Sequence, residues 1–251
     1  MSMKHVPKAI LATSLLLAGV QVQAGGDGPH WGYSGEAGPA NWGRLSPEFS
    51  LCEMGKNQSP VNLTAALDAP LPDLQLQYGA TMNEVVNNGH TIQVNSQPGS
   101  VMVLEGKEYA LKQVHFHTPS ENHIDGRSFP MEAHFVHADA QGNLAVVGVM
   151  FEPGLDDNSA LATYWRHMPT AQGGHSALKI RQNAGDLLPA SQAAYYRFNG
   201  SLTTPPCSEG VKWVVLKSPV KASETQIDRF RKVIGENNRP IQPLNARVIV
   251  D

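Results

Sequence analysis

Short hydrophobic runs separated by turn residues limit the folds open to this 251-residue chain more than any other feature. Runs rich in β-branched and aromatic residues, bounded by turn pairs such as Asn88-Gly89 and Asp125-Gly126, are typical of strands. Helical periodicity is sparse, so the pattern predicts a mainly β (β-rich α+β) fold with a few short peripheral helices. The expected strands are Leu74–Tyr78, His90–Val94, Ser100–Leu104, Ala110–His117, Met131–His137, Leu144–Phe151 and Val211–Lys217, and the expected helices are Asn158–Met168 and Ser223–Ile234.

The first 24 residues have the form of a secretory signal peptide. Lys4 and Lys8 precede a twelve-residue apolar run, Ala9–Val20, and Val22-Gln23-Ala24 has the small-residue pattern of a cleavage site. The run is shorter than the roughly 20 residues that span a bilayer. We therefore expect residues 1–24 to be removed, although an uncleaved anchor or a buried helix is the alternative. Residues 25–251 contain no long linker and no internal repeat, and we expect them to form one domain without a membrane span.

The charge of the remaining chain argues against nucleic acid as a partner. The whole chain has 19 basic and 22 acidic side chains, and removal of residues 1–24 would leave 17 basic and 22 acidic ones. A mildly acidic protein without basic runs lacks the electrostatic footprint that binds a phosphate backbone.

Two cysteines, Cys52 and Cys207, are the whole cysteine content. After export they meet an oxidising compartment, which favours a single disulfide between them. Two buried free thiols are the alternative.

The segment Gln113-Val-His115-Phe-His117 carries the clearest chemical signal. On a strand, residues i and i+2 point to the same face, so His115 and His117 project together while Phe116 points to the other side. An antiparallel hairpin with the next predicted strand brings His134 beside them. Three neutral imidazoles on a rigid sheet form a tetrahedral metal site with one open position, which is typical of catalytic zinc. The spacing alone leaves a structural role for these histidines open.

Further motifs recur along the chain in a fixed order. They are His30-Trp-Gly-Tyr33, Asn57-Gln-Ser-Pro-Val61, Asn87-Asn-Gly-His-Thr91, Gln113–Glu121, Glu132–His137, Leu144-Ala-Val-Val-Gly148, Ser201-Leu-Thr-Thr-Pro-Pro206 and Pro243-Leu-Asn-Ala-Arg247. In order and spacing this set resembles the α-class carbonic anhydrases, in particular the secreted bacterial type. These zinc enzymes hydrate CO2 reversibly to bicarbonate and a proton, and they are themselves the standard example of a three-histidine catalytic zinc site.

The resemblance implies a large, twisted, mostly antiparallel central sheet with Zn²⁺ at the base of a cleft. It also assigns roles to the reacting groups. His115, His117 and His134 would bind zinc, and Gln113 and Glu132 would orient the imidazoles. Thr203 would accept a hydrogen bond from zinc-bound hydroxide and pass its own proton to Glu121, and His90 would shuttle protons. An apolar wall that CO2 contacts would consist of Val136, Val146, Leu202 and Trp213, and Thr204 would be a polar residue on the substrate side. The polar side of the cleft, which binds water, would consist of Tyr33, Asn88 and Gln93. The resemblance also implies a disulfide between Cys52 and Cys207.

One position departs from the family pattern. Members often have histidine directly after the glutamate that accepts from the threonine, whereas here Asn122 follows Glu121. The departure puts the hydrogen bonding behind Glu121 in doubt.

Two other functions compete with this prediction. A cupin would use His115, His117 and Glu121 as metal ligands, but it needs a second motif that the chain lacks. A carbonic-anhydrase-like binding module without catalysis would typically lack one of the zinc histidines, and all three are present. We therefore expect a periplasmic or secreted enzyme, monomeric or homodimeric, whose partner is a small-molecule substrate, CO2 or bicarbonate.

Overall fold

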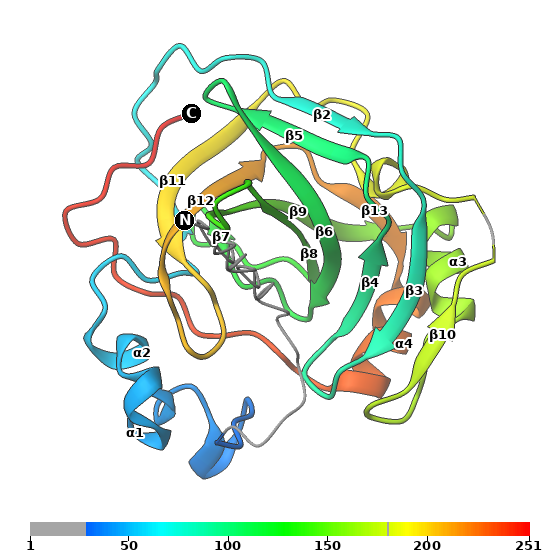
Figure 1. Cartoon of the computed structure of the whole chain (residues 1–251), viewed down its shortest axis with the longest axis horizontal. Helices are drawn as coiled ribbons and strands as arrows, with labels where there is room; N and C mark the ends of the chain where they lie inside the picture. The colour runs from blue at the N-terminus through cyan, green and yellow to red at the C-terminus, as the bar shows by residue number, and fades with distance from the viewer. Residues whose placement is uncertain (1–28, 180) are drawn as a thin grey trace, which may run out of the picture.

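A computed structural model describes residues 29–179 and 181–251, so the predicted signal peptide lies outside the described residues. A large twisted sheet dominates the fold (Figure 1). Its strands run in the order β10-β3-β4-β6-β8-β9-β12-β11, with β5 beside β6, β2 beside β5 and β13 beside β9. The pairs β9–β12 and β9–β13 are parallel and the other pairs of this sheet are antiparallel, which confirms the mainly β, mostly antiparallel fold.

The strands of this sheet are β2 (Gln75–Tyr78), β3 (Met82–Asn87), β4 (Ile92–Ser96), β5 (Ser100–Leu104), β6 (Lys107–His117), β8 (Met131–Ala138), β9 (Leu144–Gly154), β10 (His175–Ala177), β11 (Tyr195–Ser201), β12 (Glu209–Leu216) and β13 (Val220–Ser223). A separate parallel pair consists of β1 (Asn62–Leu63) and β7 (His123–Ile124). All seven predicted strands are present, and Ser100–Leu104 has the predicted bounds.

The start of β4 differs from the prediction for a local reason. The strand begins at Ile92 rather than at His90, because the Asn88 side chain closes a turn over the intervening residues. Asn88 Oδ1 accepts hydrogen bonds from the backbone N–H of His90 at 3.0 Å and of Thr91 at 2.9 Å. His90 is therefore held in the turn.

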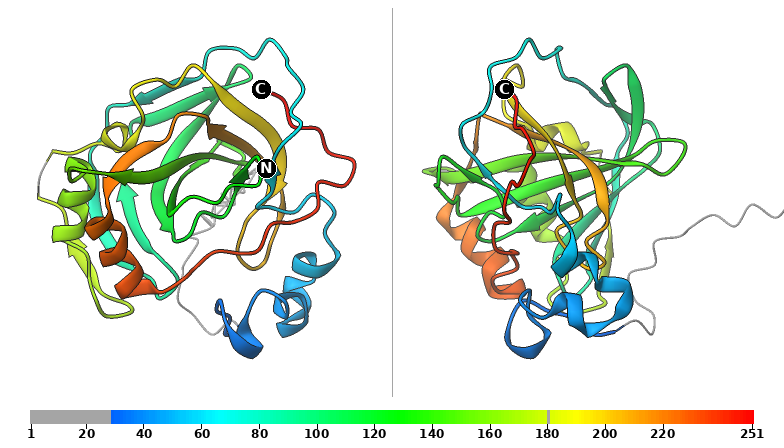
Figure 2. Two further views of the ribbon diagram at one scale, coloured as in Figure 1. Left: turned by 180° about the vertical axis from the view of Figure 1, so that it is seen from behind. Right: turned by 90° about the vertical axis from the view of Figure 1, so that its left-hand side faces the viewer.

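The two longest helices among the described residues cover one side of the sheet. They are α3 (Ser159–Arg166), which Asn158 caps, and α4 (Glu224–Ile234), which Ser223 caps in a capping box with Gln226. Figures 1 and 2 show them side by side. Trp165 of α3 stacks on Phe230 of α4 and contacts Phe116 of β6, so both helices bury their apolar faces against the sheet.

Shorter helical segments complete the structure. The N-terminal ones are η1 (Gly35–Ala37), α1 (Trp42–Leu45), η2 (Pro47–Phe49) and α2 (Leu51–Met54), and η3 (Ala184–Leu187) precedes β11. In the described part of the chain, no helix combines the length and the apolar character needed to cross a membrane.

The strands β6 and β8 present different chemistry on their two faces. Val114 and Phe116 of β6 and Phe135 of β8 are fully buried in the core that α3 and α4 cover. The alternation along each strand then turns His115, His117 and His134 to the opposite face. This confirms the face assignment made from strand parity.

A disulfide joins Cys52 in α2 to Cys207, just before β12, as predicted. It ties the N-terminal helices to the segment that contains Thr203 and Thr204.

Candidate metal centre

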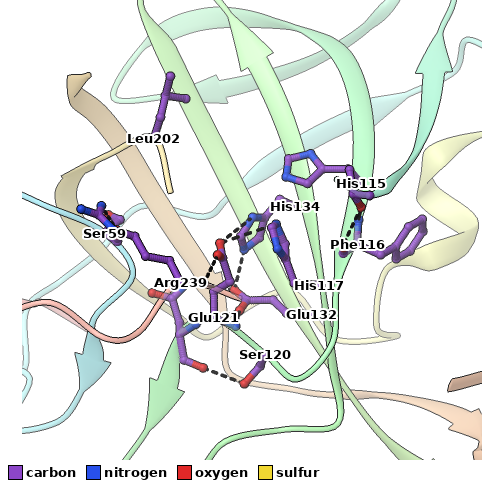
Figure 3. A network of polar contacts seen from close by, with 12 residues as sticks. Ser59, His115, Phe116, His117, Ser120, Glu121, Glu132, His134, Leu202 and Arg239 are labelled. Carbon is purple, nitrogen blue, oxygen red and sulfur yellow. Dashed lines mark hydrogen bonds and ion pairs between the residues drawn. The ribbon is translucent and has the colours of Figure 1, made fainter. Parts of the chain in front are cut away.

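The three predicted histidines converge at the centre of the sheet. The register of β6 and β8 places His115 directly opposite His134, and His117 opposite Glu132. One ring nitrogen from each histidine lies within 4.8 Å of the other two. His117 and His134 are 1% exposed, and His115 is half-buried. Figure 3 shows the imidazoles of His117 and His134 turned toward the Glu121 carboxylate.

Each histidine has a contact that orients its other ring nitrogen. His115 Nδ1 lies 2.9 Å from Gln113 Oε1, and His117 Nδ1 lies 2.7 Å from the carbonyl oxygen of Asn237. His134 Nε2 lies 2.9 Å from Glu132 Oε1, in a contact without good hydrogen-bond geometry. These contacts leave His115 Nε2, His117 Nε2 and His134 Nδ1 to face one another. Gln113 and Glu132 thus lie where their predicted orienting role requires.

The electrostatics keep the imidazoles neutral. Burial lowers the pKa of His115 and His134 well below the ordinary value, and the neighbouring imidazoles lower it further. Burial also lowers the pKa of His117, although the hydrogen bond to Asn237 opposes that shift. Neutral imidazole has the free lone pair that a metal ligand needs.

The remaining polar atoms also fit a metal ion. His117 Nε2 and Glu121 Oε2 are buried and have no hydrogen-bond partner among the described residues. Buried polar atoms normally have partners, so such a pair fits a site that binds an ion. Three neutral nitrogen donors without a thiolate suit zinc in a site with an open position.

Glu121 lies beside this cluster and is fully buried. Its Oε1 accepts a hydrogen bond of 2.8 Å from the backbone N–H of Arg239, and its Oε2 lies 3.5 Å from His117 Nε2. Burial raises the pKa of Glu121 to about 8, while the Arg239 N–H and the Thr203 hydroxyl act to lower it. Thr203 is therefore near Glu121, and the relay between them stays a prediction.

Asn122, which stands where members of the family often have histidine, hydrogen-bonds to Glu132 and not to Glu121. This answers the question about the hydrogen bonding behind Glu121. Asn122 Nδ2 donates to Glu132 Oε1 at 2.8 Å, and the backbone N–H groups of Asn122 and Glu121 each donate to Glu132 Oε2 at 2.9 Å. The backbone N–H of Val61 donates to Asn122 Oδ1 at 3.0 Å, which fixes the orientation of the amide. The Glu132 carboxylate is thus held in place behind His134.

The predicted apolar wall gathers next to the histidines. Val136 of β8 pairs with Val146 of β9, which pairs with Trp213 of β12. Leu202 packs against the same hydrophobic cluster, and the Trp213 ring lies 4.9 Å from the ring of His134 between centroids. Four side chains expected to contact CO2 therefore form one surface, and the half-buried Thr204 directly follows the buried Thr203.

The predicted polar residues lie on the other side of the histidines. Gln93 of β4 pairs in register with His115, and the Asn88 side chain closes the turn that carries His90. The carbonyl of His90 accepts from Asn237 Nδ2 at 3.0 Å, so the turn is joined to the residue that orients His117. Tyr33 is half-buried. Burial raises the pKa of its hydroxyl, and the charge of Glu121 raises it further.

The comparisons with known proteins agree with this geometry. Residues 37–251 match the family described as eukaryotic-type carbonic anhydrase. A carbonic anhydrase of Pectobacterium carotovorum is 49% identical over 244 residues, which cover 97% of this chain and 99% of the relative. One of Neisseria gonorrhoeae is 48% identical over 252 residues, with 99% and 98% covered. The α-carbonic anhydrase of Thermovibrio ammonificans, solved with the inhibitor sulfanilamide, is 50% identical with a TM-score of 0.87, covering 89% of this chain and 100% of that one.

The chain belongs to the α-carbonic anhydrase family. It is therefore an enzyme, and the general reaction of its family is the hydration of CO2. Both the cupin and the non-catalytic binding module predicted as alternatives are wrong.

Some contacts around the three histidines of this carbonic anhydrase were not predicted from the sequence. Asn237 orients His117 through its backbone carbonyl, which any residue type could supply, so no side-chain signal marks it. Gly148, opposite His134 on β9, leaves the space that the Glu132 carboxylate occupies. The ring of Trp31 stacks on His90 with centroids 3.7 Å apart, so His90 has a packed position in the turn.

Proposed function

We propose that this chain is a zinc-dependent carbonic anhydrase that hydrates CO2 reversibly, with zinc bound by His115, His117 and His134. The observation that carries the proposal is the convergence of three imidazole nitrogens within 4.8 Å of one another, from the buried His117 and His134 and the half-buried His115. Zinc bound there supplies a nucleophilic hydroxide near neutral pH, because it lowers the pKa of water from ~15.7 to ~7. Gln113, Glu132 and the Asn237 carbonyl keep the imidazoles oriented for this ion.

Thr203 and Glu121 orient the attacking oxygen. A hydroxyl has one proton to donate, so Thr203 can give it to Glu121 and must then accept from the attacking oxygen. That leaves a lone pair of the oxygen free to face CO2. The scheme needs an ionised Glu121. Burial disfavours the ionised form, and a cation bound by the neighbouring histidines would favour it.

The apolar wall of Val136, Val146, Leu202 and Trp213 holds the substrate. CO2 is small and apolar, so it gains little from polar contacts and rests against apolar side chains. The product is charged and polar, and it leaves this surface as water returns. Thr204 borders the same space on the polar side.

His90 carries the released proton toward solvent. Hydroxide from bulk water could remove protons at no more than ~10⁹–10¹⁰ M⁻¹s⁻¹, which gives roughly 10²–10³ per second at pH 7. The zinc chemistry of this family supports turnover of ~10⁶ per second. A histidine with a pKa near neutrality closes this gap, and Tyr33, Asn88 and Gln93 line the polar side on which ordered water would connect it to the site.

The test is stopped-flow hydration of CO2 by purified protein with a measured zinc content, against the same protein stripped of metal. Turnover that requires zinc and exceeds ~10³ per second supports both the metal site and a working shuttle. Hydration that survives complete metal removal would contradict the proposal.

We further propose that the enzyme is exported to the periplasm or secreted. The predicted signal peptide, 1–24, and the disulfide both support an oxidising destination. Intact mass of the exported protein tests this, since a chain that retains residues 1–24 would contradict cleavage. The same sample in light scattering distinguishes a monomer from a homodimer, the two states expected.

A further inference from the structure

A chain of polar side chains leads from the neighbourhood of His115 to the edge of the sheet. Gln93 Nε2 donates to Asn95 Oδ1 at 2.6 Å, and Asn95 Nδ2 donates to Glu84 Oε2 at 3.0 Å. The other oxygen of Glu84, Oε1, lies 3.2 Å from His175 Nδ1. None of these contacts takes part in holding the three histidines.

The strand register places this chain on the same face as the metal centre. Residues directly opposite each other on neighbouring strands point to the same face. Gln93 is opposite His115, and Glu84 is opposite Asn95. Gln93 and Asn95 are half-buried, whereas the side chains of Glu84 and His175 are 33% and 59% exposed. This series of hydrogen-bonded side chains therefore runs from the polar side of the cleft to solvent.

The carboxylate of Glu84 decides which way each amide of this series of side chains points. An ionised carboxylate only accepts hydrogen bonds, so Asn95 must turn its NH2 group to Glu84. Its carbonyl oxygen is then left for Gln93, which must donate to it through Nε2. The consequence is that Gln93 directs its own carbonyl oxygen, Oε1, away from the chain. With a group at position 84 that could donate as well as accept, both amides could reverse without losing a hydrogen bond.

We propose that Glu84 is a positioning residue that keeps Gln93 as a hydrogen-bond acceptor toward water in the cleft. The inference rests on the proposed function, in which a proton leaves the site through water on the polar side of the cleft. A proton moves through water only where each molecule donates to the next acceptor, so the wall of the path must have a fixed polarity. An acceptor at Gln93 takes one hydrogen of a neighbouring water and leaves its second for the next molecule. A donor at the same place would reverse that order.

The test replaces Glu84 with glutamine, which has the same shape and can donate. We expect Glu84→Gln to lower kcat in weak buffer about threefold or more and to leave kcat/KM for CO2 unchanged, because proton removal follows release of bicarbonate. Added imidazole should restore kcat, since it accepts the proton directly. Asn95→Asp puts an acceptor-only carboxylate beside Gln93, so Gln93 must still donate through Nε2 and kcat should stay unchanged. Glu108→Gln, at an exposed position near the start of β6, is the matched control for loss of one charge and should change neither constant.

Two results would overturn the inference: an unchanged kcat in Glu84→Gln, or a parallel fall of kcat and kcat/KM in this variant that imidazole does not reverse. His90→Ala in the same assay separates this inference from the proposed function. If His90→Ala leaves kcat unchanged while Glu84→Gln lowers it, His90 is not the shuttle but the role of Glu84 stands. If His90→Ala lowers kcat and Glu84→Gln does not, the shuttle stands and the role of Glu84 is refuted.

Discussion

At the residue scale, the position of the Glu132 carboxylate depends on the absence of a side chain at Gly148. A Cβ atom there would lie 2.9 Å from Glu132 Oε1 and 3.3 Å from a methyl group of Val215, both closer than ordinary contacts. Glu132 would have to move, and it supports His134 from behind. We expect Gly148→Ala to raise the zinc dissociation rate about 10- to 100-fold, the usual effect of disturbing a group that supports a ligand.

The matched control is Gly79→Ala, because a Cβ atom at Gly79 would meet nothing within 4 Å. Transfer of zinc to a coloured chelator measures the dissociation rate for both variants. An unchanged rate in Gly148→Ala would show that Glu132 does not need this space.

His90 gives a second prediction at this scale. Burial lowers the pKa of His90 below 6.5, and the nearby His30 lowers it further. Only neutral imidazole accepts a proton, so the part of kcat that depends on His90 should rise with pH and reach its midpoint below pH 6.5. His90→Ala should lower kcat in weak buffer toward the bulk-hydroxide limit of ~10³ per second. Stopped-flow assays from pH 5.5 to 8.5, with and without imidazole, measure both effects, and an unchanged kcat would remove His90 from the mechanism.

At the element scale, strand parity was sufficient to predict that the three histidines converge, although the zinc itself was predicted from the family resemblance. Alternation along β6 and a hairpin to β8 were enough to bring His115, His117 and His134 together. The Asx turn at Asn88, by contrast, moved the start of β4, because a side chain supplied the hydrogen bonds that a strand would have made.

Several strands were not predicted at all. The sequence of β3, Met82–Asn87, mixes polar and apolar residues without alternation, and β10 is only three residues long. Both form because neighbouring strands supply their hydrogen-bond partners. Contacts of this kind are set by the tertiary fold and leave no local pattern in the sequence.

His137 on β8 makes that strand sensitive to acid. It is fully buried on the opposite face to His134, where its Nε2 lies 2.7 Å from the Tyr78 hydroxyl of β2. Burial lowers the pKa of His137 to about 4. The unfolded chain, with a histidine pKa near 6.5, therefore binds more protons than the folded chain between these values. Stability should fall as pH drops through this window, by about 2 kcal/mol at pH 5 from this residue alone.

His137→Gln should reduce this dependence, because glutamine can still accept from Tyr78 and does not titrate. Urea unfolding of the metal-free protein at pH 7 and pH 5 measures the difference in free energy of unfolding. His175→Gln, at an exposed position, is the control and should leave the pH dependence as it is. Equal acid sensitivity in His137→Gln and the unmutated protein would refute the assignment.

At the scale of the whole molecule, Arg239 connects the disulfide region to the metal centre. Its guanidinium is almost completely buried and donates to the carbonyl of Cys52 at 2.8 Å and to that of Ser59 at 2.7 Å. Its backbone N–H donates to Glu121. The C-terminal segment thus holds the N-terminal helices and the site in one hydrogen-bonded unit, with the Cys52–Cys207 disulfide as a covalent closure beside it.

The disulfide and Arg239 should contribute in different ways. The disulfide closes a loop with a sequence separation of 155 residues, and the loss of that constraint on the unfolded chain should cost about 4–5 kcal/mol of stability. Arg239 keeps its bonds to Ser59 and Gln58 without the disulfide. We therefore expect the double variant Cys52→Ala, Cys207→Ala to unfold at lower urea concentration but to retain kcat/KM within about twofold at 25 °C while folded. A folded variant with little activity would mean that the disulfide itself positions Thr203. A stability loss below about 1 kcal/mol would mean that the unfolded chain keeps these segments close together without the disulfide.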